Sequence, residues 1–397
     1  VVICTLDRAD ALRATLASLR LQRHSDIEVV VVDGPSTDHT ADVLREYGDE
    51  IKVARNPVRN LSISRNIGIK AAAGEFVAFV DDDALPEASW LAQILPSFAD
   101  ERVGGVGGIV FDHTGVTLQY RYSAANRFGE PEFSETRPFD ELSVAGGSRF
   151  PYLQGTNAVF RRDALATIGL FDETFDYFLD ETDLCCRLVD AGYRLRQRAD
   201  APVHHKYLPS ATRNAARVVT NWYPIVKNQA YFAYRHAASH GELEIIDRLL
   251  ARIRVLVQDT RNHVAAGHLD ADQVGTAIDA CGAGLAEGIR LGREARPGPL
   301  AAVELPPTKF RTFPTTGSSD GRRIAIVASD DPPEAMVTAT RMSEHGHDVR
   351  VLAPAHPHSV DLVDGVWLHR LGGSSATAEL ARIHTWWTPD EVRTHPA

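Results

Sequence analysis

The run best suited to chemistry is three consecutive acids, Asp81, Asp82 and Asp83, at the end of the apolar stretch 75–80. Neighbouring carboxylates repel one another, so a cation or hydrogen-bond donors must offset their charge. Mg²⁺ or Mn²⁺ takes one or two protein carboxylates and fills its other positions with phosphate oxygens and water. We therefore predict a metal-diphosphate site at this run, with a solvated acidic turn before Pro86 as the alternative.

A second acid, Asp33, also ends an apolar strand-like run and is followed by turn residues. A carboxylate at that position can accept the imide proton of a uracil or thymine ring. Ser36 or Asp38 fits the cap of the next helix, and a plain helix cap is also the alternative for this whole motif.

Arg65 and Asn66 lie at the start of a helical stretch that leads into the aspartate run. There a guanidinium and the helix N–H groups can face an anionic ligand. We interpret both residues as ligands of that anion, and a salt-bridged surface arginine is the alternative.

A further helical segment opens with two acids, Asp180 and Glu181, and continues to Asp183 and Arg187. The last two stand four residues apart, a spacing typical of a stabilising pair on one helix face. A helix N-terminus favours an ionised carboxylate, which is the state that a general base needs. We predict that Asp180 or Glu181 is the base, and the choice between them is open.

Two adjacent imidazoles, His204 and His205, follow a turn downstream of this helix. Neutral imidazole is a common metal ligand, so either ring can reach the metal, and a structural role is the alternative for each.

The elements that must position these residues alternate β-branched runs with amphipathic stretches, which is typical of a parallel sheet covered by helices. We expect strands at 1–4, 27–32, 51–54, 75–80 and 103–110, and helices at 9–21, 40–47 and 62–73. In such a Rossmann-like α/β layout, ligands bind beyond the carboxyl ends of the strands. The candidate residues should therefore cluster at that edge.

Composition shifts divide the chain into four parts. We expect an α/β catalytic domain over 1–215, a helical region over 216–295, a proline-rich linker over 296–320, and a partial Rossmann-like segment over 321–397. Residues 111–150 are expected to be irregular and to face the substrate. The last segment predicts a strand at 324–328, a helix at 334–345 and a strand at 349–353. It is too short for a complete doubly wound domain, so it is truncated or packs on something else.

Composition also excludes some functions. The formal charge of -11 argues against a nucleic-acid partner. The four cysteines lack the spacing of a zinc site or disulfide framework, which favours a reducing, cytoplasmic location. No apolar run approaches the ~20 residues that span a bilayer. The chain begins inside a strand-like run without an initiator methionine, so we expect its natural start to be missing.

Residues 213–240 are dense in bases and aromatics for an acidic chain. Such side chains suit a peripheral contact with the inner face of a membrane, where Arg217, Lys227 and Arg235 would be exposed on one face. The alternative is a helix packed on the catalytic domain, because Trp222 and Ile225 fit one buried stripe.

In this order the motifs resemble family 2 of the inverting glycosyltransferases, which have the GT-A fold, over about residues 1–215. The resemblance assigns Asp33 to the base of the nucleotide, and Asp81 and Asp83 to the family's Asp-x-Asp pair, whose second member ligates the metal. It also implies donor contacts by Thr5 and Arg8. The remaining matches are the acceptor-side strand with Gly155, Thr156 and Asn157, the base at Asp180 or Glu181, and a metal-ligating His204 or His205.

The resemblance implies metal-dependent transfer of a hexose or deoxyhexose, with inversion, from a UDP- or dTDP-sugar to a hydroxyl of a glycan or lipid-linked acceptor. Mn²⁺ or Mg²⁺ would be the cofactor. Residues from Arg323 onward resemble the start of a GT-B-fold glycosyltransferase, to which we assign no activity. One alternative is a non-catalytic nucleotide-sugar-binding scaffold. Another is a sugar-phosphate nucleotidyltransferase, although the glycine-rich loop that it needs after the first strand is absent.

Overall fold

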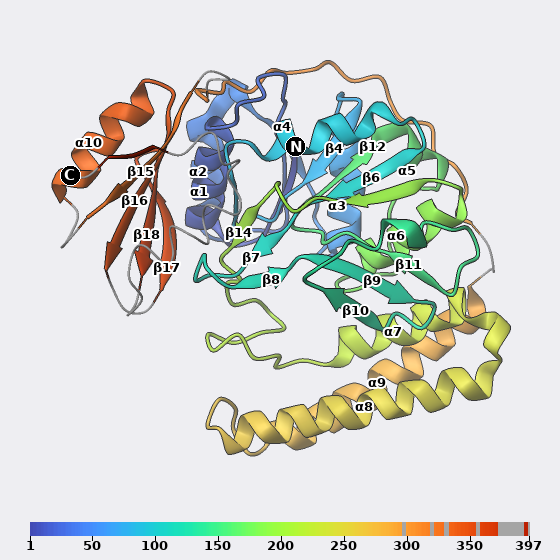
Figure 1. Ribbon diagram of the computed structural model, residues 1–397. Helices are drawn as coiled ribbons and strands as arrows, with labels where there is room; N and C mark the ends of the chain where they lie inside the picture. Colours follow the sequence, from blue (N-terminus) through green and yellow to red (C-terminus); the bar gives the residue numbers. More distant parts are fainter. Residues whose placement is uncertain (296–298, 318–320, 329–332, 355–357, 372–392, 396–397) are drawn as a thin grey trace.

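The computed structural model describes residues 1–295, 299–317, 321–328, 333–354, 358–371 and 393–395. A central α/β domain lies between a three-helix region and a smaller C-terminal β-sheet unit (Figure 1). The fold class predicted from the sequence, a mostly parallel sheet flanked by helices, is confirmed.

The core of the central domain is a seven-stranded sheet. Its strand order is β13 (Arg194–Gln197), β6 (Val103–Gly107), β12 (Ala158–Arg161), β4 (Phe76–Phe79), β1 (Val2–Thr5), β2 (Val30–Asp33) and β3 (Lys52–Arg55). Strand β12 runs antiparallel to both of its neighbours, and the other pairings are parallel. Thr5 pairs with Asp33, so the carboxyl ends of β1 and β2 lie side by side.

Helices cover both faces of this sheet because apolar side chains alternate along its strands. Ile3 and Val31 pack with Leu12 and Leu16 on one face, whereas Val2 and Val30 belong to the cluster on the opposite face. The helices of the domain are α1 (Ala9–Arg20), α2 (Thr40–Tyr47), α3 (Leu61–Ala71), α4 (Trp90–Ile94), α5 (Arg162–Thr167) and α6 (Asp180–Asp190). The helix predicted at 9–21 is confirmed as α1, whose Leu12, Leu16 and Leu19 form a buried stripe.

The predicted strand 103–110 is wrong in its extent, because the chain leaves the central sheet after Gly107. A side chain at Gly108 would clash with the carbonyl of Ala201 and lie 2.5 Å from the Asn157 amide nitrogen, so only glycine fits where the chain passes to the second sheet. Residues 110–111 form β7 in a second sheet of order β5 (Ala84–Pro86), β14 (Val203–His205), β7 (Val110–Phe111) and β8 (Leu118–Tyr120).

The segment 111–150, expected to be irregular, also contributes strands. Besides β8, it forms a three-stranded sheet of order β10 (Pro131–Ser134), β9 (Tyr122–Asn126) and β11 (Arg149–Pro151). These strands are short and lack a clear alternation of apolar and polar residues, which is the signal on which strand prediction depends.

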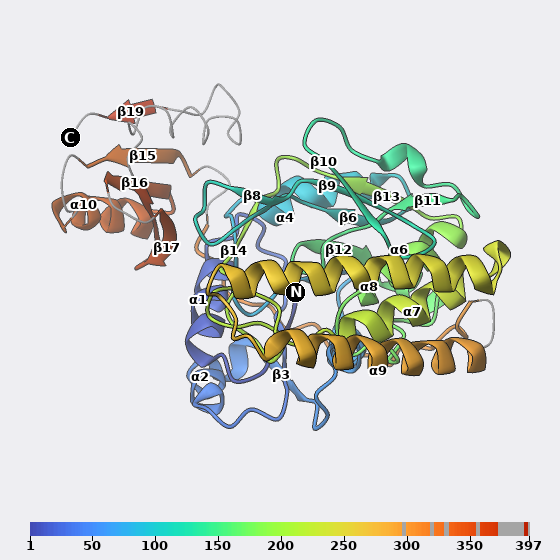
Figure 2. The ribbon, with the colours of Figure 1, turned by 90° about the horizontal axis from the view of Figure 1, so that it is seen from below.

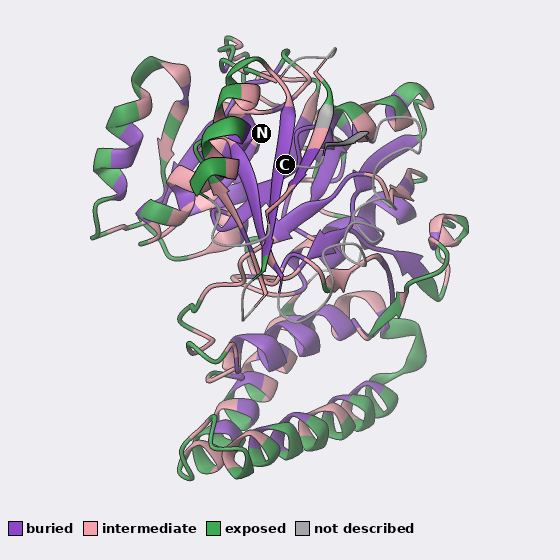
Figure 3. Ribbon diagram, turned by 60° about the vertical axis from the view of Figure 1, so that its left-hand side comes forward, coloured by how far each residue is buried: buried purple, intermediate pink, exposed green. Residues whose placement is uncertain are grey.

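The helical region contains α7 (Tyr223–His236), α8 (Glu242–Ala265) and α9 (Gln273–Glu294). Helix α7 is largely buried, while α8 exposes its outer face (Figure 3). Helix α9 approaches α7 through glycines four residues apart, Gly284, Gly288 and Gly292. A Cβ at Gly288 would clash with the Lys227 carbonyl and lie 2.7 Å from the Cβ of Ala230, so the close packing depends on the missing side chain.

Lys227 and Arg235 are buried, so the expected exposed face of Arg217, Lys227 and Arg235 does not form, and the membrane contact through 213–240 stays a prediction without support. Lys227 pairs with Asp176, and Arg235 lies near Asp172 and Asp183, which buries both bases against the catalytic domain. Trp222 and Ile225 are buried, as the alternative interpretation required. None of the helices in the described part of the chain combines the length and apolar character needed to cross a bilayer.

The segment expected to be a linker follows the surface of the catalytic domain in its described part, 299–317. The amide of Phe313 donates to the carbonyl of Ile27 at 2.8 Å, and that of Val303 donates to Ala166 at 2.9 Å. The ring of Phe313 is fully buried beside Tyr47. This segment is therefore a packed strap rather than a free spacer.

The C-terminal unit has a sheet of order β17 (Ser359–Val363), β18 (Val366–Leu371), β16 (Asp348–Pro354), β15 (Arg323–Val327) and β19 (Arg393–His395), covered by α10 (Pro333–Glu344). The predicted strand-helix-strand opening is confirmed within a residue or two. The unit lies beside α1 and the β5–β14 sheet (Figures 1 and 2).

We predict that Gly288→Ala lowers the free energy of unfolding by about 1–3 kcal/mol, because the added methyl overpacks the α7–α9 contact. The matched control is Gly282→Ala on the same helix, where no atom lies within 4 Å of the added Cβ. That change should stabilise the helix by up to ~1 kcal/mol. Denaturant unfolding measures both, and equal effects at the two positions would contradict the close packing.

Candidate functional site

One wall of the site gathers two of the three aspartates and one of the two histidines. Asp81 and Asp83 follow β4, and His205 ends β14, which pairs with β5 so that His205 faces Ala84. The His205 Nε2 atom lies 3.2 Å from Asp83 Oδ1 and 3.7 Å from Asp81 Oδ2. The potential ligand atoms of these three residues lie within 4.8 Å of one another, which a single divalent ion can bridge.

The chemistry of this cluster fits a cation. Asp83, expected at an exposed strand end, is in fact buried, and its Oδ1 makes no well-formed hydrogen bond among the described residues. Burial would raise the pKa of Asp83, but His205 and Arg8 hold it well below the usual carboxyl range. The carboxyl group therefore stays ionised, and its Oδ1 is contacted by His205, another candidate ligand of the ion.

Asp82 points away from this cluster and holds other site residues. It accepts hydrogen bonds from Thr5 Oγ1 at 2.8 Å and from Arg8 Nη1 at 3.0 Å. Arg8 also donates to the carbonyl of Pro209 at 2.9 Å, which ties the segment after His205 to the first strand. The structure thus brings Thr5, Arg8 and Asp82 together as a support for the metal cluster.

The structure does not bring His204 to the cluster, so we drop it as a metal ligand. Neighbouring residues of a strand point to opposite faces, and the His204 ring is buried on the far side of β14. There its Nε2 atom lies 2.6 Å from Glu87 Oε1. Burial lowers the pKa of His204, although Glu87 acts in the opposite sense.

The acidic pair at the start of α6 forms another part of the site. Asp180 is buried and pairs with Arg65, which is itself buried. Glu181 keeps a fifth of its side chain exposed and lies 4.0 Å from Arg65 Nη1. Burial and the negative charge of Asp180 raise the pKa of Glu181 well above its ordinary value, whereas Arg65 lowers it.

Arg65 links the two walls. Burial would lower its pKa, but the charges of Asp180, Glu181 and Asp81 raise it, so the guanidinium stays charged between the acidic pair and the metal cluster. The guanidinium packs against Gly155, where an added Cβ would meet Arg65 Cζ at 3.1 Å. Gly155 thus provides the space that Arg65 occupies, a role that the sequence analysis did not foresee.

Two of the predicted ligands, Asn157 and Asn66, have neighbours that point to structural roles. Asn157 is buried and bonds Trp90, Ile109 and Ala201. Asn66 bonds both backbone groups of Phe171 and does not line the cleft. Thr156 does line the cleft.

Asp33 lies at the carboxyl end of β2, as predicted, and is buried. Its Oδ2 pairs with Arg55 at 2.7 Å, and its Oδ1 has no hydrogen-bond partner among the described residues. The adjoining Gly34 and Pro35 line the cleft, whereas Asp33 itself, which directly precedes them in the chain, is fully buried.

A cleft of about 970 Å³ joins these groups, with the metal cluster, Arg65 and Glu181 all in its lining. Many of its other lining residues are aromatic, namely Tyr120, Phe133, Tyr152, Tyr177, Phe178, Tyr207, Trp222 and Tyr223. They come from the segment that runs from β8 to the residue after β11, the loop before α6, the segment after β14 and the start of α7. The helical region therefore forms part of the cleft wall.

Sequence reasoning missed the role of Arg213, which it counted only among the bases near a membrane. Its guanidinium lies 3.6 Å from the ring centre of Tyr207 and donates to the Tyr177 hydroxyl at 2.9 Å. Within the described ranges, no carboxylate pairs with this cation. No spacing rule would have found it, because segment 206–222 has no regular structure that places residues relative to β14.

The chain is similar to curated glycosyltransferases. It is 30% identical to the succinoglycan biosynthesis protein ExoM of Rhizobium meliloti, over 61% of this chain and 73% of that protein. It is 31% identical to the pre-mycofactocin glycosyltransferase of Mycobacterium tuberculosis, over 52% of this chain but only 42% of that protein. The chain thus spans less than half the length of the latter relative.

Among solved structures, the mannosyltransferase PcManGT from Pyrobaculum calidifontis, in complex with GDP-Man and Mn²⁺, superposes with a TM-score of 0.43 at 20% identity. The match covers 74% of this chain and 83% of that one. The family model described as glycosyl transferase family 2 matches residues 1–169, which contain β1 to β12 and the aspartate run. This match and the ExoM similarity show that the chain belongs to glycosyl transferase family 2.

Proposed function

We propose that the chain is an inverting, metal-dependent glycosyltransferase of glycan or polysaccharide biosynthesis, which moves a hexose or deoxyhexose from a nucleoside-diphosphate sugar to an acceptor hydroxyl. One observation carries the proposal. A carboxylate-imidazole cluster suited to a divalent ion and a partly exposed carboxylate with a raised pKa line the same cleft. The first group suits a diphosphate leaving group, and the second suits proton removal from a hydroxyl.

The donor would lie along the carboxyl ends of the strands. Asp33 would accept the imide proton of uracil or thymine, which favours a UDP- or dTDP-sugar. Asp81, Asp83 and His205 would hold Mn²⁺ or Mg²⁺, which offsets charge on the diphosphate as the sugar leaves. Arg213 faces the same cleft without a carboxylate partner among the described residues, so it is free to meet phosphate oxygens.

Glu181 would remove the acceptor proton. Both acids line the cleft, but Asp180 is buried against Arg65, whereas Glu181 keeps a fifth of its side chain exposed. The base would then be the second acid of the pair that the sequence left open. Direct displacement by the activated hydroxyl inverts the anomeric carbon and needs no covalent enzyme intermediate.

The acceptor would enter over the aromatic part of the cleft. Phe133 is 54% exposed, and its ring centre lies 5.6 Å from that of Tyr120. A sugar ring has both apolar C–H groups and polar hydroxyls. Exposed aromatic rings beside polar side chains can bind both kinds of group. A glycan acceptor therefore fits better than a lipid-linked one. A lipid-linked acceptor would call for a helix with exposed bases at the membrane, and Lys227 and Arg235 are buried.

The alternatives are weaker. A non-catalytic scaffold does not explain an acidic pair with one partner buried and the other left open. A nucleotidyltransferase would need phosphate-binding glycines after β1, where Leu6, Asp7 and Arg8 stand. For the C-terminal unit we retain the resemblance to the start of a GT-B fold as a proposal, without an activity.

We expect Asp83→Asn to lower transfer by about 100-fold or more, because an amide binds a divalent cation far more weakly than a carboxylate does. The substitution preserves shape and can still accept the Leu208 amide. The matched control is Asp10→Asn, since Asp10 is highly exposed on α1. Product formation from UDP-sugars with Mn²⁺ is the measurement, and near-normal turnover in EDTA would refute the metal dependence.

Transfer should fall as the pH drops through the pKa of Glu181, because only the ionised carboxylate accepts a proton. Burial and Asp180 raise that pKa, so the acid limb of kcat/KM should lie above the ordinary glutamate value of about 4.3. Glu181→Gln should lose about 10²–10⁴-fold in rate while still binding UDP. An acid limb at or below the ordinary value, or an active Glu181→Gln, would remove Glu181 from this role.

UDP or dTDP should bind more tightly than GDP, because the one unpaired oxygen of Asp33 matches the single imide N–H of a pyrimidine, whereas guanine presents two adjacent donors and Arg55 already holds the other oxygen. Isothermal titration with Mn²⁺ measures the three affinities. Asp33→Asn should reduce the difference between the affinities for UDP and for GDP. Preference of the parent chain for GDP would rule out the assignment of Asp33 to a pyrimidine.

A further inference from the structure

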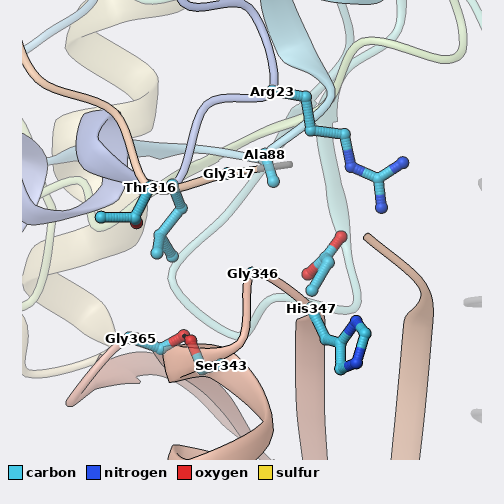
Figure 4. A pocket seen from close by; sticks show the side chains of 10 residues that line it. Arg23, Ala88, Thr316, Gly317, Ser343, Gly346, His347 and Gly365 are labelled. Atoms are coloured by element: carbon cyan, nitrogen blue, oxygen red, sulfur yellow. Dashed lines mark hydrogen bonds between the residues drawn. The ribbon is translucent and has the colours of Figure 1, made fainter. Parts of the chain in front are cut away.

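The C-terminal unit packs directly behind the strands that carry the proposed metal ligands. Val360 and Trp367 of this unit are fully buried in a cluster with Leu85, which lies on β5 two residues beyond Asp83. At the edge of the same interface, Arg23 and Ala88 of the catalytic domain line a small cavity together with His347 of the unit (Figure 4). The two parts of the chain therefore share one packed boundary.

A charged network lies within this boundary. Arg350 of β16 pairs with Glu87, whose other carboxylate oxygen lies 2.6 Å from His204 Nε2. His369 of β18 lies 3.0 Å from Arg350, and all four side chains are buried. Burial would raise the pKa of Glu87, but Arg350 and His204 hold it below its usual range. A charged glutamate can therefore persist here only with its partners in place.

This network touches both strands of the metal cluster from behind. His204 precedes His205 on β14, and Glu87 directly follows β5, which begins one residue after Asp83. A second link crosses the boundary beside it, since Lys206 Nζ lies 2.8 Å from Asp361 of the C-terminal unit. The Lys206 amide in turn donates to the Asp83 carbonyl at 2.9 Å.

We propose that Arg350, reaching across from the C-terminal unit, is a positioning residue for the metal site. By neutralising Glu87 it keeps Glu87 bonded to His204 and thereby fixes β14 against β5, so that Asp83 and His205 converge on the ion. Without Arg350, a stranded buried charge at Glu87 draws in water or a new partner and loosens the two strands. The inference rests on the metal site of the proposed function.

The test measures Mn²⁺ binding by calorimetry in the full chain and compares Arg350→Gln with Arg341→Gln on the exposed side of α10. Loss of partners behind metal ligands typically weakens metal affinity by about 10–100-fold. We expect a loss of that order in Arg350→Gln, near-parent affinity in Arg341→Gln, and substantial recovery in Arg350→Lys, which retains the charge. In transfer assays, saturating Mn²⁺ should restore most of kcat in Arg350→Gln, a response that general unfolding would not show.

Glu87→Gln provides a second variant if Arg350→Gln fails to fold, because it breaks the same ion pair from the other side and weakens the contact that holds His204. Weaker Mn²⁺ binding in folded Glu87→Gln supports the positioning role, and parent-like affinity overturns it. Parent-like affinity in folded Arg350→Gln overturns it as well. If the parent chain itself binds no Mn²⁺, the proposed metal site fails, which is a different result from a parent that binds and variants that do not differ.

Discussion

The burial of negative charge is the constraint on which the rest of the structure depends. Asp82, Asp83, Glu87 and Asp180 are all nearly or fully buried, and an isolated ionised carboxylate is unstable in such surroundings. Each of these four carboxyl groups contacts a cationic or hydrogen-bonding partner from a distant part of the chain. These contacts fix the arrangement of the strand ends, because moving any one of them would leave a charge uncompensated.

The partners come from elements far apart in the sequence. Arg8 after β1 serves Asp82, Arg65 on α3 serves Asp180, and Arg350 of the C-terminal unit serves Glu87. Two other carboxylates of the site are less buried than these. Asp81 and Glu181 keep 35% and 20% of their side chains exposed. The supporting pairs leave these two groups facing the cleft, where ligands and protons can reach them.

Much of this arrangement follows from the sequence, because it depends on local periodicity. Alternating apolar runs predict the central strands, and acids directly after such runs must lie at the carboxyl edge of the sheet. Asp33, Asp81 and Asp83 were found for that reason. The choice between His204 and His205 was not decided, because alternation shows that they face opposite ways but not which face holds the metal.

What the sequence could not supply was contact between remote segments. The roles of Gly155 and Arg213 depend on irregular backbone with no period to extrapolate, and the burial of Lys227 and Arg235 depends on acids about fifty residues earlier in the chain. The sequence pattern of an amphipathic helix rich in bases is the same whether its cations contact lipid headgroups or carboxylates inside the protein. Here the cations meet internal carboxylates. Asp172 and Asp176 precede helix α6, and Asp183 lies in its first turn, close to Glu181. Helix α7 thus stabilises the same charged wall that the proposed base requires.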